Sequence, residues 1–271
     1  MTDRPSWAPQ GIDMNAPSVS RIYDYFLGGS HNFEVDREAA RAALLAMPSA
    51  PKISQANRAV MRRAVRFAMS RGITQFLDIG SGIPTFGNVH EVAQGIDPDA
   101  RVVYVDYDPV AVAHSRAVLE KVDNATVAAA DLREPQSILD HPETRRLLDF
   151  DRPVALMLVA VVHFLPDSAH PAEAIATLRD ALAPGSVMVM THATLEHGHT
   201  PDGQRGVQQA YQRTGTPLLM RSVAELEPFF AGFEIVEPGI VPLPYWRPDT
   251  PEPEIEDPAV LHGLAGVGLK A

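Results

Sequence analysis

The sequence predicts an α/β fold in which helices cover both faces of a mostly parallel sheet. After Gly72, short apolar runs alternate with stretches that have a helical pattern, which is typical of parallel strands buried on both faces. Helix start and stop signals separate the runs, and a glycine-rich turn follows the first of them. The predicted strands span residues 75–79, 102–105, 126–129, 154–159 and 187–191.

Three helices are expected ahead of the sheet, and they form an N-terminal helical extension over residues 20–72. Residues 1–19 contain Pro, Asp, Ser and Asn without an apolar period, so we expect a flexible N-terminal arm. Helical spacing predicts helices over residues 20–26, 36–47 and 53–70. On the third helix an apolar stripe lies opposite an arginine face, which we interpret as solvated. Its members are Arg58, Arg62, Arg63 and Arg66.

Residues 73–271 are expected to form one core domain. Beyond the five runs, late strands are predicted over residues 233–237 and 266–270. Residues 191–215 are polar, and residues 238–258 are dense in proline and acidic residues. We expect two long loops there, of which the second is stiff and crosses the surface.

The composition excludes several classes of protein. A net charge of -11 argues against a general nucleic-acid binder, whose surface must neutralise phosphates. The absence of cysteine excludes a disulfide framework, a thiolate metal site and a cysteine nucleophile. The first residues lack a secretory signal pattern, and the longest apolar run, residues 154–162, is shorter than the roughly 20 residues that cross a bilayer. We therefore expect a cytoplasmic protein without a membrane span.

The first predicted strand runs into a glycine turn and then a helix expected from about residue 85 to 94. Gly80 and Gly82 let the backbone turn tightly and approach a ligand closely, and the helix offers free N–H groups. A dinucleotide fold would have a third glycine at position 85, which is Thr85. A nicotinamide cofactor is therefore disfavoured.

Acidic residues follow the next two predicted strands. Asp106 ends a buried strand, where a carboxylate can accept both hydroxyls of a ribose. Asp108 precedes Pro109, so it is a second candidate ligand or simply a helix cap. Asp131 lies just past the third strand, where it can reach an adenine amino group. With the glycine turn, Asp106 and Asp131 indicate a nucleoside site at one edge of the sheet.

These motifs resemble, in order and spacing, those of S-adenosylmethionine-dependent methyltransferases over about residues 75–191. Over nearly the whole chain the sequence is similar to the actinobacterial S-adenosyl methyltransferase family, long described as a domain of unknown function. The residues that carry this narrower resemblance are 20–29, Asn32-Phe33, Asp36-Arg37, Asn57-Arg58 and Trp246-Arg247-Pro248.

The resemblance implies a Rossmann-like class I methyltransferase, with a seven-stranded sheet that ends in an antiparallel hairpin. It also implies S-adenosylmethionine as cofactor and S-adenosylhomocysteine as its product. Pro84 stands where many methyltransferases have glycine, which leaves the path of the loop open. By the resemblance, Asp78, Gly80 and Gly82 surround the methionine moiety, Asp106 binds the ribose, and Asp131 with Leu132 lies on the adenine side.

Further candidates come from outside these motifs. His163 follows the fourth predicted strand, and we hypothesise that it is a general base or lines the acceptor pocket; the alternative is a packed, hydrogen-bonded histidine. Tyr23 and Asn32 lie beside a glycine pair and are predicted to contact the cofactor from a closing lid, or else simply to pack. A solvated loop is favoured over a metal site for His192, Glu196, His197 and His199.

The sequence thus predicts a methyltransferase whose acceptor is a small molecule or a protein side chain rather than bulk nucleic acid. Two alternatives stay open. A sensor module would hold S-adenosylmethionine without turnover, because the motifs report binding alone. An NAD-dependent oxidoreductase would share the topology, but the missing third glycine disfavours it.

Overall fold

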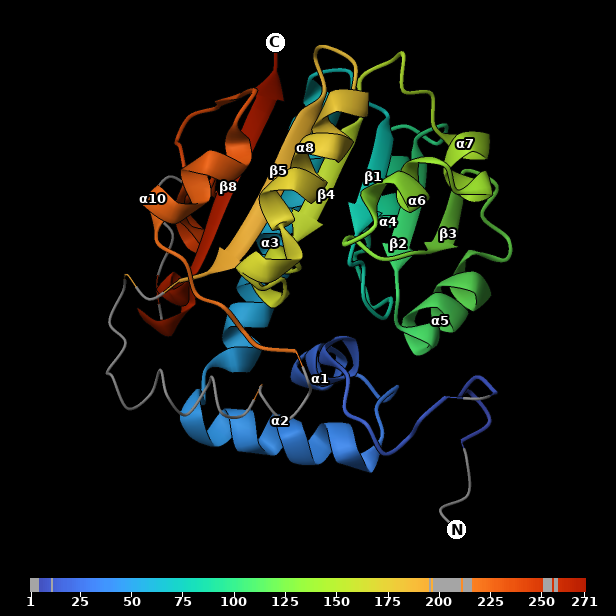
Figure 1. Ribbon diagram of the computed structural model, residues 1–271, viewed down its shortest axis with the longest axis vertical. Helices are drawn as coiled ribbons and strands as arrows, with labels where there is room; N and C mark the ends of the chain where they lie inside the picture. The colour runs from blue at the N-terminus through green and yellow to red at the C-terminus, as the bar shows by residue number, and fades with distance from the viewer. Residues whose placement is uncertain are drawn as a thin grey trace.

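The predicted strands form one mixed sheet in the computed structural model, which describes residues 5–10, 12–194, 196, 211, 216–250, 255 and 258–271 (Figure 1). The strand order is β3-β2-β1-β4-β5-β8-β6. β8 is antiparallel to both β5 and β6, and the pairs from β3 to β5 are parallel. The bounds are β1 Gln75–Ile79, β2 Arg101–Asp106, β3 Ala125–Ala129, β4 Ala155–Val159, β5 Val187–Ala193, β6 Phe233–Ile235, β7 Val241–Pro242 and β8 Gly263–Lys270.

The sheet has eight strands rather than the expected seven. The additional strand is β7, a two-residue segment that pairs with β8. It lies inside the predicted loop 238–258, and a strand of two residues in a proline-rich stretch gives no recognisable sequence pattern. The expected antiparallel end of the sheet is confirmed.

Helices cover both faces, with α8 in front of the sheet and α3 behind it in Figure 1. Alternate residues of β1 point to opposite sides: Leu77 belongs to the core beneath α6, α7 and α8, whereas Phe76 packs with α3, α4 and α5. The helices are α1 Val19–Phe26, α2 Glu34–Ala46, α3 Ala50–Ser70, α4 Val89–Gln94, α5 Pro109–Leu119, α6 Pro135–Leu139, α7 Pro142–Leu147, α8 Pro171–Ala181 and α10 Val223–Leu226. Short 3-10 helices are η1 Val162–Phe164, η2 Asp167–Ala169, η3 Glu227–Phe230, η4 Leu243–Tyr245 and η5 Pro258–His262.

The arginine face of α3 is not simply solvated. Arg63 donates from Nε to the carbonyl of Trp246 and from Nη2 to that of Leu243, both at 2.8 Å. Arg66 pairs with Asp249 at 2.7 Å. Trp246 is fully buried, so the proline-rich segment does not merely cross the surface; the helix docks it onto the core.

Helices α1 and α2 lie beyond the carboxyl ends of the parallel strands, at the lower edge of Figure 1. Trp7 belongs to the segment that was expected to form a flexible arm, yet it packs there too. The Trp7 ring stacks on Phe33 with centroids 5.0 Å apart, and both belong to an apolar cluster with Ile83 and Val110. The apolar residues that make these contacts do not recur at a regular spacing, so the sequence pattern did not predict the packing.

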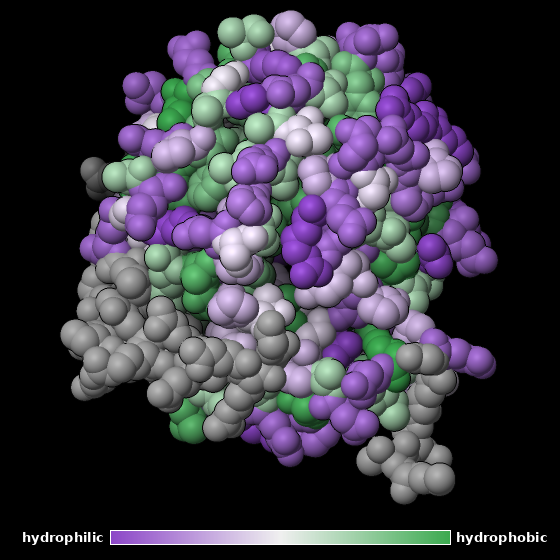
Figure 2. Space-filling model, viewed as in Figure 1, coloured by the Kyte–Doolittle hydropathy of each residue, from purple (hydrophilic) through white to green (hydrophobic). Residues whose placement is uncertain are grey.

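The surface is polar, and the described helices are not of the membrane-spanning kind. Hydrophilic side chains are spread over the face seen in Figure 2. Among the helices that the structure describes, none is both long enough and apolar enough to span a membrane.

Candidate active site at the carboxyl ends of the strands

One cavity of about 650 Å³ opens where β1, β2 and β4 end. That volume lies within the range of about 300–1,000 Å³ found for small-molecule sites, and open α/β sheets bind ligands at this edge. Its walls come from the strand ends and from the N-terminal segment with α1 and α3. Eight of the predicted site residues line it: Tyr23, Asp78, Gly80, Gly82, Asp106, Asp108, Asp131 and Leu132.

The glycine turn after β1 has the conformation that the sequence predicted. Gly80 has a φ of +71°, and a Cβ built on it would lie 2.4 Å from Cγ2 of Val161. Gly82 has a φ of +67° but open space around it. The N–H of Gly80 donates to the carbonyl of Val105 at 2.8 Å, which holds the turn against β2. Gly80 is therefore required for both its backbone conformation and its close packing.

The helix after the turn begins later than expected. α4 starts at Val89 instead of Thr85, because Gly87 has a φ of +71° and Asn88 donates its N–H to Glu91 Oε2 at 2.7 Å as the helix begins. The expected N–H groups of a helix start are thus displaced from Gly82, and the turn itself borders the cavity.

Asp106 is buried and firmly oriented. Its Oδ2 accepts the N–H of Gly82 at 2.7 Å, and its Oδ1 accepts the N–H of Asp108 at 2.8 Å. Burial raises its pKa to about 6, and the backbone N–H groups oppose that rise. A carboxylate has further lone pairs, so Asp106 can also accept hydroxyl groups from the cavity.

Asp78 and Arg58 bring opposite charges to the end of the cavity near the glycine turn. Burial raises the pKa of Asp78 to about 7, the positive charge of Arg58 lowers it, and Asp106 raises it. Arg58, on α3, donates from Nη2 to the Gly87 carbonyl and to Asn88 Oδ1, each at 3.1 Å. Its Nε is buried without a hydrogen bond. Arg58 also lines the cavity. The prediction that Arg58 belongs to a solvated face is therefore wrong.

The far end of the cavity is bounded by Asp131, Leu132 and Tyr107. Burial acts to raise the pKa of Asp131, but its hydrogen bonds from Arg133 outweigh this and the pKa lies below its usual value. The Arg133 guanidinium lies 5.9 Å from the centroid of the Tyr107 ring. This end combines a flat ring with an ionised carboxylate, which suits a base such as adenine.

Asp108 and Tyr23 border the cavity, but their polar atoms already have partners. Asp108 Oδ1 accepts the N–H of Val110 at 2.8 Å, so the helix-cap interpretation is confirmed. The hydroxyl of Tyr23 accepts from Asn57 Nδ2 at 2.9 Å and donates to the carbonyl of Ser54 at 3.2 Å. These bonds fix the Tyr23 ring in the wall.

Comparison with known proteins decides the family. The model of the S-adenosyl methyltransferase family matches residues 5–271. The chain belongs to this family. It is therefore a methyltransferase, and S-adenosylmethionine is its methyl donor. The predicted enzyme class and cofactor are thereby confirmed.

Solved structures agree with the family assignment. The chain is 43% identical to a candidate methyltransferase from Thermobifida fusca, with a TM-score of 0.91 over 98% of this chain and 99% of that one. It is 39% identical to a DUF574 family protein from Streptomyces avermitilis, with a TM-score of 0.90 over 96% and 99%. The CurJ carbon methyltransferase, 16% identical with a TM-score of 0.55 over 85% and 57%, shares the fold. No curated protein matches the chain.

Two of the predicted residues of this methyltransferase do not line the cavity. Asn32 is buried between α1 and α2, where its Nδ2 donates to Asp24 Oδ2 at 2.8 Å and its Oδ1 accepts from Arg37 at 3.2 Å. His163 is buried, its pKa is well below the usual value because of burial, and its Nδ1 accepts the N–H of Ala193 at 3.3 Å. Both side chains join chain segments to one another instead of facing the donor cavity.

His192 does not lie in a solvated loop as expected: it belongs to β5 and is buried. His197 and His199 lie outside the described residues. His192 Nε2 lies 3.0 Å from Nη1 of Arg221, and its Nδ1 lies 2.7 Å from the carbonyl of Ala193. Within the ranges that the structure describes, no group of three or more histidine or acidic side chains can hold a metal ion.

Three cavity residues of the methyltransferase were missed as site residues in the sequence. Tyr107 directly follows Asp106. Its position beside a residue predicted to bind the ribose could have identified it as a site residue. Arg58 was assigned to a solvated face because helical periodicity shows which face is polar but not what that face meets. Val161 gave no signal, because its role against Gly80 depends on a contact between the segments that follow β4 and β1.

Proposed function

We propose that this methyltransferase transfers the methyl group of S-adenosylmethionine to a small, largely apolar acceptor inside the cavity. The observation that carries the proposal is the continuity of the cavity. The strand-end wall, with Asp78, Asp106 and Asp131, faces the same space as Met61, Phe164 and Leu165. One cavity thus offers charged groups for a donor and an apolar wall for an acceptor.

The residues fit S-adenosylmethionine from end to end. Among the described residues, nothing lies within 4 Å of a Cβ built on Gly82, so a ligand can approach the turn closely at that residue. In the proposal Asp106 accepts the ribose hydroxyls, and Asp131 with Leu132 and Tyr107 holds the adenine. The ammonium and carboxylate of the methionine moiety face Asp78 and Arg58, whose charges complement them.

The acceptor lies against the wall formed by residues past β4 and by α1 and α3. Phe164, Leu165 and Met61 supply apolar surface, while Tyr23 presents a ring fixed by its hydroxyl bonds. Aromatic and apolar walls with a few polar groups are typical of sites for small molecules. A compact, largely apolar acceptor therefore suits this end of the cavity.

The chain contributes mainly by positioning. When bound, S-adenosylmethionine supplies a methyl group that its sulfonium has already activated. The walls bring donor and acceptor together, which replaces a bimolecular encounter by an oriented one. Residues 20–72 act as a cover in this proposal, because α1 and α3 close the cavity and exclude water from the transfer.

Tritiated methyl transfer tests the proposal. The protein is incubated with labelled S-adenosylmethionine and an extract of Streptomyces avermitilis, the source of one relative. We expect label in the small-molecule fraction. Label confined to protein would contradict the small acceptor, and donor binding without any labelled product would favour a sensor over an enzyme.

Asp106→Asn tests the donor wall separately. Loss of the charge-assisted bonds should weaken binding of S-adenosylhomocysteine by about tenfold to a hundredfold, measured by calorimetry. Asp140→Asn is the matched control, because Asp140 is exposed and pairs only with surface groups. Equal affinities of the two variants would remove the ribose role of Asp106.

A further inference from the structure

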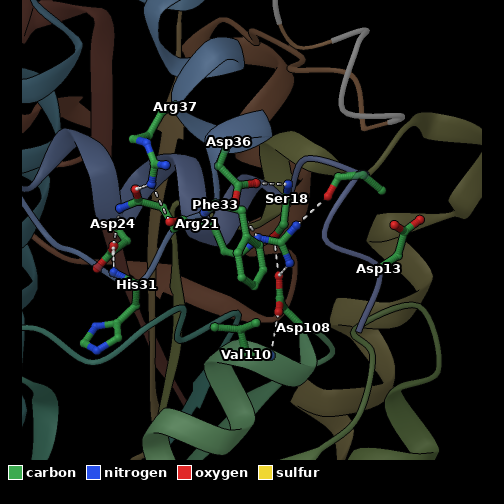
Figure 3. Close-up of polar contacts among 12 residues, drawn as sticks. Asp13, Ser18, Arg21, Asp24, His31, Phe33, Asp36, Arg37, Asp108 and Val110 are labelled. Atoms are coloured by element: carbon green, nitrogen blue, oxygen red, sulfur yellow. Dashed lines mark hydrogen bonds and ion pairs between the residues drawn. The ribbon is translucent and has the colours of Figure 1, made fainter. Parts of the chain in front are cut away.

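A buried network of charges joins the N-terminal helices to the turn after β2 (Figure 3). At its centre is Arg21 of α1, whose Nε donates to Asp36 Oδ2 of α2 at 2.8 Å. Its Nη1 lies 3.4 Å from Oδ2 of Asp108. The three side chains are 4%, 0% and 4% exposed. Loss of one member of such a buried group leaves the other charges without compensation.

Ser18 makes a second link between the same two acids. Its N–H donates to Asp36 Oδ1 at 2.9 Å, and its hydroxyl donates to Asp108 Oδ2. The other oxygen of Asp108 caps α5 by accepting the N–H of Val110. One carboxylate therefore serves both the start of α5 and the attachment of the N-terminal segment.

The network continues to the donor wall of the cavity. The N–H of Asp108 donates to Asp106 Oδ1 at 2.8 Å, and Asp106 Oδ2 accepts the N–H of Gly82 at 2.7 Å. A shift of Asp108 would move one of the groups that orient Asp106. Arg21 and Ser18 also line the cavity themselves, so the same contacts shape the cover and the turn beneath it.

We propose that Arg21 is a positioning residue that holds Asp106 in its binding orientation by fixing Asp108. The inference rests on the proposed function, which assigns the ribose to Asp106. Arg21 acts through Asp108, and its guanidinium carbon lies 5.1 Å from the centroid of the Phe33 ring. Attachment of residues 12–23 and affinity for the donor are therefore coupled through Asp108, which Arg21 and Ser18 both contact.

The test compares Arg21→Met, Arg21→Lys and Ser18→Ala in the full chain. Calorimetry measures the affinity for S-adenosylhomocysteine, and tritiated transfer gives KM for the donor and kcat. We expect Arg21→Met to lose at least about fivefold in affinity, the lower end of typical couplings between sites. KM should rise more than kcat falls, and Arg21→Lys should restore part of the affinity by retaining the charge.

Ser18→Ala keeps the test decisive if Arg21→Met fails to fold, because it removes one bond to Asp108 without leaving a buried charge unpaired. Arg41→Gln is the control, since its ion pair with Glu34 is exposed. The inference is overturned if Asp106→Asn binds S-adenosylhomocysteine more weakly than the unaltered protein but folded Arg21→Met binds it equally well. If Arg21→Met does not fold, Ser18→Ala takes its place in this comparison. Retained affinity in Asp106→Asn would instead contradict the proposed function.

Discussion

The two walls of the cavity are built in different ways. The strand wall consists of the residues that end β1, β2 and β3, and each lies within a few residues of a buried strand. The helical wall consists of residues 12–23 and of Asn57, Arg58 and Met61 in α3. These segments reach the cavity through contacts between distant parts of the chain; Ser18 and Asp108 are 90 residues apart. Short motifs therefore locate the donor, whereas tertiary contacts define what covers it.

The largest effect should come from breaking the strand wall at Gly80. Gly80→Ala places a Cβ 2.4 Å from Val161 at a φ of +71°, so we expect donor binding to be lost. The free energy of unfolding should fall by at least about 2 kcal/mol, from backbone strain and overpacking together. Calorimetry and denaturant titration measure the two effects.

Gly72→Ala is the matched control for Gly80→Ala. Its φ is +79°, but nothing lies within 4 Å of the added Cβ. It should lose only about 1–2 kcal/mol from the left-handed conformation and keep its donor affinity. Similar binding by both variants would show that the packing of Gly80 against Val161 does not shape the donor site.

The pair Asp78 and Arg58 connects the two walls and should give an intermediate, pH-dependent effect. With the pKa of Asp78 near 7, affinity for S-adenosylmethionine should rise as the pH increases through 7, because the ionised carboxylate attracts the ammonium group. Asp78→Asn should remove the part of the rise centred near pH 7 and leave the part near pH 6 that ionisation of Asp106 contributes. Affinity that is independent of pH in the unaltered protein would contradict the assignment.

The same shift has a stability consequence of defined sign. A carboxyl group whose pKa is raised by folding from 3.8 to about 7 binds protons more tightly in the folded state, so its contribution to stability is present below pH 4 and is lost as the pH rises through 7. Above pH 7, Asp78→Asn should unfold with a free energy about 1–3 kcal/mol higher than the unaltered protein. Thermal melts at two pH values measure this difference.

The smallest effect concerns the attachment of the helical wall to the rest of the molecule. Arg63→Met removes two hydrogen bonds to the carbonyls of Leu243 and Trp246 and should reduce stability by about 1–2 kcal/mol. Arg66→Gln, which loses an exposed ion pair, should cost less than about 1 kcal/mol. Donor affinity should stay unchanged in both. If Arg66→Gln lost more stability than Arg63→Met, the contact between Arg63 and the proline-rich segment would contribute little to stability.

Sequence patterns predicted the strand wall well because its information is local. Apolar runs gave the five parallel strands, and the positions of Gly80 and Asp106 relative to those runs gave the turn and the acid. The start of α4 was misplaced because the left-handed Gly87 delays the helix. Even there, the error concerned a single turn of backbone.

Residues outside the strand wall were predicted less well, and the errors share one cause. The side chains of Asn32 and His163 were expected to face the cavity. They contact Asp24 and the Ala193 amide instead. Trp7 packs through contacts that have no periodic signature. A single sequence indicates which residues are polar or apolar, but side-chain direction between separate segments is set by packing.

The position of β8 has a consequence for synthesis. It follows every other strand in the chain, yet it lies between β5 and β6 in the sheet. While the ribosome is still producing this segment, β5 carries an unpaired edge, and such edges recruit strands from neighbouring chains. The nascent protein therefore passes through a stage that is prone to aggregation, which ends only when residues 263–270 have emerged and inserted.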